Sequence, residues 1–207
     1  MALWIVRHAR PLIAAGICYG VMDVQADAAE TDQAARALAA ALPTGAVLRV
    51  SPLTRCQQLA RALCAVRADL HAHTDPRLRE MDFGAWEGVA WNAIPQQALQ
   101  AWTDDFGNHR FGGAESSNAV LARVAQVWDE AQGYHDTIWI THAGVARAAH
   151  LLADGVRVLA RADQWPVQAP GYGQWLQLPV IACNKTGNSP GRGIVTSPPH
   201  GKNRAGP

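Results

Sequence analysis

Short apolar runs alternate with longer amphipathic stretches in the first part of the chain. Residues 3–6 form a continuous, partly β-branched run, which is typical of a strand buried on both faces of a sheet. Residues 28–42 carry apolar side chains at helical spacing and end at Pro43, which predicts a helix. Residues 46–50 predict a second strand, and residues 53–66 predict a second helix. Strands and helices that alternate with short connections favour an α/β fold with a parallel sheet.

The same pattern resumes after an irregular stretch. Residues 75–88 are punctuated by proline and glycine, and residues 89–106 indicate a short helical excursion interrupted by Pro95. Apolar stripes and runs then predict the last elements, namely a helix over 117–131, a strand over 137–141, a helix over 143–154 and a strand near 174–178. We therefore expect three layers: a mostly parallel, doubly wound sheet with helices on both faces.

The composition changes near residue 180. The chain has 207 residues, of which 49% are apolar, so residues 1–179 can bury the core of one domain. Residues 180–207 are rich in glycine and proline, contain no acidic residue and carry little apolar surface. Such a segment cannot bury enough to offset the entropy lost on ordering. We interpret it as a disordered basic tail.

Charge and cysteine usage exclude several classes of protein. A formal net charge of +1 gives no support to nucleic-acid binding or to a membrane-surface role. No apolar run is long enough for a membrane helix and no signal segment precedes the first strand, so we expect a cytoplasmic protein. The cysteines show no metal-binding spacing and are expected to be free thiols; they are Cys18, Cys56, Cys64 and Cys183. We expect neither a metal nor a cofactor.

Basic side chains follow three of the predicted strands. Arg7 and His8 end the first strand, Arg55 lies in the first turn of the helix after the second, and His142 follows the strand at 137–141. Each of them alone is more often structural than catalytic. Because the ends of parallel strands share one edge of a sheet, they should converge there beside helix N-termini that favour anions. The sequence therefore predicts an anion site at this edge.

Five segments carry a more specific signal. They are RHA at 7–9, SPLTRCQQLA at 51–60, LREMDFGAWEG at 78–88, GGAES at 112–116 and THAG at 141–144. In type and order they resemble the signatures of the histidine phosphatase superfamily, also called the phosphoglycerate mutase-like family. The resemblance extends from the start of the chain to about residue 154 and implies the phosphoglycerate mutase-like fold.

The resemblance also implies roles for five residues. His8 would be the nucleophile that accepts the phosphoryl group, while Arg7, Arg55 and His142 would hold its oxygens. Glu80 would be the acid that protonates the leaving alkoxide. Neutral imidazole is a competent nucleophile toward phosphorus, and phosphoryl transfer needs mainly positioning and charge neutralisation, which arginines can supply without a metal.

Glu80 is chosen by its position in the motif alone. Asp82 and Glu87 lie in the same block and have the alternative interpretation of solvated or structural acids. Apolar neighbours, among them Met81 and Trp86, could partly desolvate the Glu80 carboxyl.

The chain departs from the family pattern at two places. Alanine stands where the signatures have glycine, at Ala9 and Ala143, and an added methyl group could crowd a bound phosphate. The asparagine that usually follows the first signature is missing, so Arg10 or a backbone group would have to replace it. The residues that we predict to bind substrate are Arg10, Tyr19, Gly20, Trp86 and Ala143.

Weaker signals favour one branch of the family. YGVMD at 19–23 and the block at 78–88 look most like α-ribazole phosphatase, which acts late in cobalamin assembly. The short body favours a phosphatase over a mutase. A broad phosphatase for sugar phosphates or nucleotides, a phosphoglycerate mutase, and a non-catalytic protein that binds phosphorylated ligands all stay open. The expected partner is a small phosphorylated metabolite, and a homodimer is left open.

Overall fold

A computed structural model describes residues 1–133 and 135–179, so the tail interpretation of 180–207 and Cys183 lie outside the described residues. The sheet has five strands in the order β3-β2-β4-β1-β5, and all neighbouring pairs are parallel except β1 with β5. The strands are β1 (Ala2–Arg7), β2 (Val47–Val50), β3 (Ala72–Thr74), β4 (Thr137–Thr141) and β5 (Trp175–Pro179). The helices are α1 (Ala28–Ala41), α2 (Thr54–Val66), α3 (Gln96–Asp104), α4 (Ser117–Ala131) and α5 (Ala143–Ala153).

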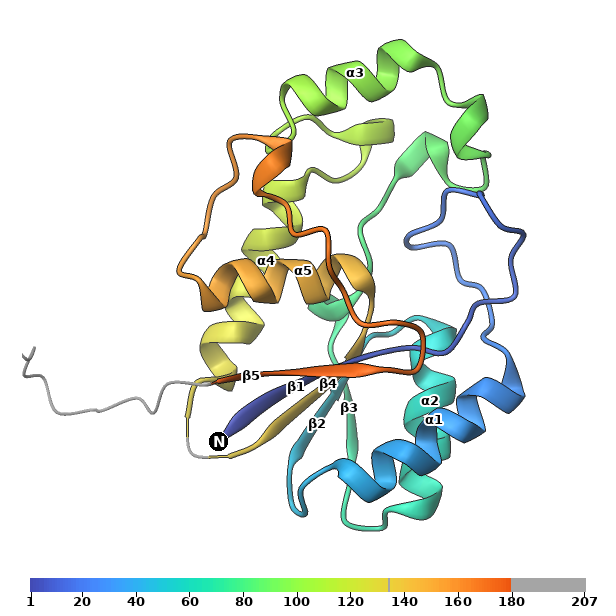
Figure 1. Cartoon of the computed structure of the whole chain (residues 1–207), viewed down its shortest axis with the longest axis vertical. Helices are drawn as coiled ribbons and strands as arrows, with labels where there is room; N and C mark the ends of the chain where they lie inside the picture. Colours follow the sequence, from blue (N-terminus) through green and yellow to red (C-terminus); the bar gives the residue numbers. More distant parts are fainter. Residues whose placement is uncertain (134, 180–207) are drawn as a thin grey trace, which may run out of the picture.

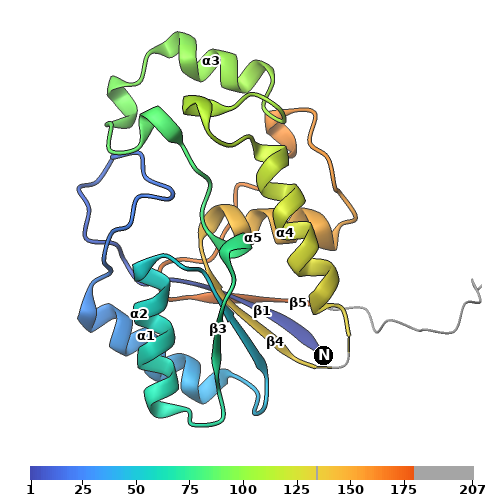
Figure 2. The same ribbon diagram turned by 180° about the vertical axis from the view of Figure 1, so that it is seen from behind.

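Helices cover both faces of this sheet, as Figures 1 and 2 show. Side chains alternate across a strand, so Trp4 and Val6 of β1 pack with α1 and α2, while Leu3 and Ile5 pack with α4 and α5. The continuous apolar runs of β1 and β4 are required because both of their faces are buried. The predicted three-layer α/β fold is confirmed.

Local signals place the helix starts. The Asp27 carboxylate accepts a hydrogen bond from the Glu30 amide at 2.8 Å, and the Ser116 hydroxyl accepts one from the Ala119 amide at 3.2 Å. Both are N-caps that satisfy amides left free in the first turn of a helix. The observed bounds of α1 and α4 lie within one residue of the predicted bounds.

Two features of the sheet differ from the sequence analysis. The short edge strand β3 was not predicted, because its residues Ala72–Thr74 are exposed and form no apolar run. The last strand was predicted without a direction, and β5 runs antiparallel to β1, with Trp175 opposite Val6. The start of β5 therefore lies at the end of β1, where the anion site is expected.

The stretch between β3 and α4 rises away from the sheet and carries α3 farthest from it (Figure 1). Short 3-10 helices interrupt this stretch at Pro76–Leu78, Gly84–Trp86, Trp91–Ala93 and Phe111–Gly113. A small apolar cluster joins this stretch to the loop between β1 and α1; its buried members are Cys18, Ile94 and Phe111. Within the described part of the chain, no helix combines the length and hydropathy needed to cross a membrane.

Candidate active site

His8 follows β1 directly and is almost fully buried, with 2% of its surface exposed. Its Nδ1 lies 2.7 Å from the Ala9 carbonyl oxygen, which can only accept a hydrogen bond, so Nδ1 carries the proton. Nε2 is then left with a lone pair, and the Arg55 Nε–H donates to it at 3.3 Å. This backbone contact therefore fixes the tautomer and presents Nε2 as the nucleophilic atom.

The surroundings of His8 keep its ring uncharged. Burial is the largest cause and the Arg55 guanidinium the next, and together they lower the pKa of His8 from 6.5 to about 3. The imidazole is neutral at physiological pH, which is the state that can attack phosphorus.

Arg55 is fully buried in the first turn of α2, at the carboxyl edge of the sheet. Its terminal amines donate to the Gly20 carbonyl at 2.5 Å and to the Met22 carbonyl at 2.9 Å. No carboxylate forms an ion pair with it among the described residues. The charge of Arg55 is thus oriented by neutral carbonyls and remains available to an anion.

Glu87 holds the loop that orients Arg55. Its carboxylate accepts hydrogen bonds at 2.9 to 3.1 Å from the backbone amides of Gly20, Val21, Met22 and Phe83. With four donors bound, Glu87 is a structural acid, one of the two alternatives that the sequence left open for it. A Cβ at Gly20 would overlap the Met81 carbonyl oxygen, so Gly20 is needed for close packing and holds Arg55 through its own carbonyl.

His142 follows β4 and occupies the N-cap position of α5, fully buried. Its ring centroid lies 5.1 Å from that of His8, and its Nε2 lies 2.7 Å from the Ser51 hydroxyl oxygen. Burial, followed by the charge of Arg55, lowers the pKa of His142 well below its ordinary value. The structure brings His142 to the same edge of the sheet as His8; its partner Ser51 was not identified from the sequence, although Ser51 opens one of the quoted segments.

Arg7 ends β1 and is held by the loop that leads into β5. It donates to the Pro170 carbonyl at 3.1 Å, and its guanidinium carbon lies 3.9 Å from the centre of the Tyr172 ring. The hydroxyl of Tyr172 is 2.9 Å from that of Tyr19. Tyr172 was not predicted from the sequence, because only the antiparallel direction of β5 brings this Gly-Tyr-Gly loop to the site.

Glu80 approaches from the segment above the sheet. Its carboxylate accepts hydrogen bonds at 3.1 Å from the amides of Met81 and Gly144. A Cβ at Gly144 would overlap the Glu80 carboxylate, so this glycine of the THAG segment allows α5 to hold the acid. Asp82 instead accepts from the Gly84 amide at 2.8 Å within its own loop.

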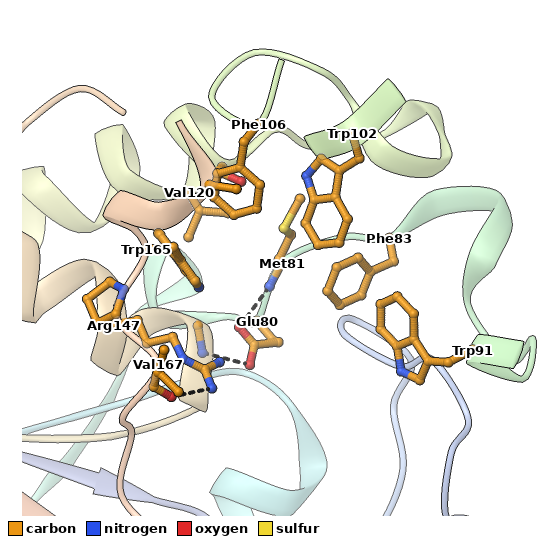
Figure 3. Close-up of a pocket in the computed structure, with 14 residues that line it drawn as sticks. Glu80, Met81, Phe83, Trp91, Trp102, Phe106, Val120, Arg147, Trp165 and Val167 are labelled. Carbon is orange, nitrogen blue, oxygen red and sulfur yellow. Dashed lines mark hydrogen bonds between the residues drawn. The ribbon is translucent and has the colours of Figure 1, made fainter. Parts of the chain in front are cut away.

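A cavity of about 410 Å³ opens beside Glu80 (Figure 3). Its walls are mostly aromatic and aliphatic, and Arg147 and Glu80 are its charged members. The large side chains around it are Met81, Phe83, Trp91, Trp102, Phe106 and Trp165. Gly144, which binds the Glu80 carboxylate, also belongs to the cavity wall, so the cavity adjoins the first turn of α5.

None of the five residues predicted to bind substrate lines this cavity. The Trp86 ring packs 5.9 Å from that of Phe111, in the small cluster above the sheet. Arg10 is exposed and forms an ion pair with Glu30 at 2.9 Å. Its guanidinium carbon lies 6.0 Å from the centre of the Tyr172 ring, which in turn lies 5.7 Å from the centre of the His8 ring, so Arg10 stays at the edge of the site.

The remaining predicted residues lie at the site. The Tyr19 ring is 5.5 Å from the Arg55 guanidinium carbon. Ala143 is buried as the first residue of α5, and Ala9 is fully buried after His8. No alanine or other non-glycine residue of the described chain has a positive φ, so the backbone does not require glycine at either position. Within residues 1–133 and 135–179, no three metal-ligating side chains gather.

Comparisons with known proteins agree with this geometry. Residues 3–168 match the family model described as the histidine phosphatase superfamily (branch 1). The chain is similar to a solved protein from Thermus thermophilus, with a TM-score of 0.64 and 30% identity, covering 86% of this chain and 92% of that one. It is also similar to the mycobacterial glucosyl-3-phosphoglycerate phosphatase, with a TM-score of 0.70 and 23% identity, covering 85% and 88%. A search of curated proteins finds no match.

Proposed function

Since the chain belongs to the histidine phosphatase superfamily and is a phosphoric monoester hydrolase, we propose that it hydrolyses α-ribazole 5′-phosphate through a phosphohistidine at His8. The proposed phosphoryl transfer is supported by one observation, the neutral and buried imidazole of His8. Its Nε2 lone pair faces Arg55, a buried arginine that forms no ion pair among the described residues. The substrate is proposed from the YGVMD and 78–88 segments and from the aromatic cavity.

The first step forms the phosphoenzyme. The phosphoryl group lies among Arg7, Arg55 and His142, and the two guanidinium groups offset its negative charge. His8 Nε2 attacks phosphorus, the bond from phosphorus to the ester oxygen breaks, and the leaving oxygen takes a proton from Glu80. The carboxylate of Glu80 is the group between the phosphate site and the cavity, which is where a leaving oxygen departs.

The second step releases phosphate. A water molecule takes the position vacated by the alcohol, Glu80 removes its proton, and the oxygen attacks phosphorus as the bond to His8 Nε2 breaks. Glu80 thus returns to its protonated state and His8 to its neutral one, so that each turnover consumes one water and leaves the protein unchanged.

The cavity favours a leaving group with a planar, apolar part. α-Ribazole joins a ribose to a dimethylbenzimidazole, and aromatic side chains such as Trp102 and Trp165 offer stacking surfaces for such a bicyclic base. A volume of about 410 Å³ is within the usual range for small-molecule sites.

Steady-state kinetics on a panel of esters tests the proposal. The panel contains α-ribazole 5′-phosphate, sugar phosphates, 3-phosphoglycerate and nucleotides, with His8→Ala as the control. A clear preference in kcat/KM for the ribazole ester is expected. Activity spread evenly over the panel would replace it with a broad phosphatase, and isomerisation of 3-phosphoglycerate would indicate a mutase. Absence of turnover and of a trapped phosphoenzyme would favour non-catalytic binding.

A further inference from the structure

Three arginines share an unusual environment in the described part of the chain. Arg7, Arg55 and Arg147 are the arginines there that are not exposed and yet form no ion pair with a carboxylate. Keeping a cation away from water without a counter-charge is costly, so such groups are expected where a ligand supplies the partner. Arg7 and Arg55 serve the phosphate, whereas Arg147 has no assigned role.

Arg147 lies one turn after Gly144 on α5 and faces the cavity beside Glu80 (Figure 3). One terminal amine donates to the Val167 carbonyl at 3.2 Å, and the buried Nε has no partner among the described residues. Burial lowers the pKa of Arg147, while the charge of the nearby Glu80 acts in the opposite direction. The rest of the cavity wall is largely apolar, and Arg147 is the cationic side chain in it.

We propose that Arg147 determines specificity by donating hydrogen bonds to oxygen atoms of the leaving alcohol, close to the ester carbon. This inference rests on the proposed function, because it places the leaving alcohol in the cavity beside Glu80. Two chemistries supply such oxygens: the hydroxyls of a ribose, and the carboxylate of a phosphorylated hydroxy acid. The planar fork of arginine can hold either one through paired hydrogen bonds.

The positions of Glu80 and Arg147 suit these two tasks. Both are held against the first turns of α5, Glu80 through the Gly144 amide and Arg147 as part of the helix. An alcohol that loses its phosphate at Glu80 therefore presents its next oxygen atoms to Arg147, and only then reaches the aromatic wall. Phenyl phosphate reaches the wall without offering an oxygen to Arg147.

The test compares Arg147→Met with the wild type on α-ribazole 5′-phosphate, 3-phosphoglycerate and phenyl phosphate. On the better of the two oxygen-bearing esters, kcat/KM should fall at least tenfold more than on phenyl phosphate. A larger loss in kcat/KM on α-ribazole 5′-phosphate would identify ribose hydroxyls as the groups that accept hydrogen bonds from Arg147. A larger loss on 3-phosphoglycerate would identify a carboxylate. Arg61→Met is the matched control, since Arg61 is exposed on α2 and forms no ion pair with any residue that the structure describes.

Equal losses on all three esters would mean that Arg147 acts through Glu80 or through the Val167 contact, and would overturn the inference, as would no loss at all. If neither protein hydrolyses any of the three esters, calorimetry still tests the inference by measuring how α-ribazole and glycerate bind to the wild type and to Arg147→Met. Weaker binding to Arg147→Met than to the wild type keeps the inference while the proposed function fails. Equal binding, or no binding to either protein, overturns it.

Discussion

At the scale of residues, single hydrogen bonds to the backbone determine where a side chain of the site carries its proton and how it is oriented. The Ala9 carbonyl fixes the proton of His8 on Nδ1, and the Gly144 amide fixes the Glu80 carboxylate. The sequence predicted both side chains, because their residue types stand at fixed places in the quoted segments. It could not predict Ser51 as the partner of His142 or Tyr172 as the neighbour of His8, since these contacts join segments far apart in the chain.

Glu80→Gln should affect substrates according to their leaving groups. A glutamine cannot donate the required proton, so kcat for alkyl esters should fall by about 10²- to 10⁴-fold, while phenyl or nitrophenyl esters, whose leaving groups need less protonation, should lose far less. Steady-state rates on both ester types measure the difference. Asp82→Asn is the control, because Asp82 bonds within its own loop. A uniform loss on both ester types would exclude Glu80 as the acid.

Ser51→Ala should reduce turnover while leaving the fold intact. The hydroxyl of Ser51 is the hydrogen-bond partner of His142 Nε2 at 2.7 Å, and without it the ring loses its fixed orientation against the phosphate. We expect kcat/KM to fall by about tenfold, the worth of one hydrogen bond. Ser51→Thr, which keeps the hydroxyl, should restore part of the activity; failure of both variants alike would point to packing rather than to the bond.

The helices and strands differ in how well their bounds and directions can be predicted from their own sequences. The runs of β1 and β4 are buried on both faces and the helices carry regular stripes, so their bounds follow from local pattern. The edge strand β3 and the direction of β5 depend on pairing with neighbours, which no local pattern records. The same distinction applies to the site. Its groups at the ends of the parallel strands could be predicted from local pattern, whereas the loop before β5 could not.

Glu87→Gln tests the link between a loop and the phosphate site. An amide offers one acceptor oxygen in place of two, so part of the four amide contacts is lost and the Gly20 and Met22 carbonyls no longer hold Arg55 firmly. The free energy of unfolding should fall by about 2 to 4 kcal/mol, and inhibition by inorganic phosphate should weaken. Denaturant unfolding and phosphate inhibition measure the two effects. Asp32→Asn is the control, as Asp32 is exposed on α1.

The buried histidines give the whole molecule a particular pH dependence. His8 and His142 have lowered pKa values in the folded state, so the unfolded chain takes up protons first as the pH falls below about 6.5. Their contribution to stability is complete above that pH and is lost as the pH falls toward the folded value, about 3 for His8. Between pH 6.5 and 5 the free energy of unfolding should drop by about 3 kcal/mol in all.

Denaturant titrations at pH 7, 6 and 5 measure this loss, and His8→Asn should remove about half of it. Inorganic phosphate should reduce it as well, since an anion at Arg55 favours protonated histidine. A stability that stays constant from pH 7 to 5 would contradict the buried, neutral state of both rings.

The cavity wall is built from segments that do not belong to the sheet. Its large side chains come from the stretch above the sheet and from the loop after α5, whereas the groups around the phosphate come from strand ends and the first turns of α2 and α5. The apolar part of a substrate can therefore come to be recognised differently by exchange of one surface segment, while Arg147 on α5 and the groups at the strand ends are kept. A graft that replaces residues 89–113 with the equivalent segment of a relative should change which apolar groups the cavity accepts, without altering the residues at the strand ends.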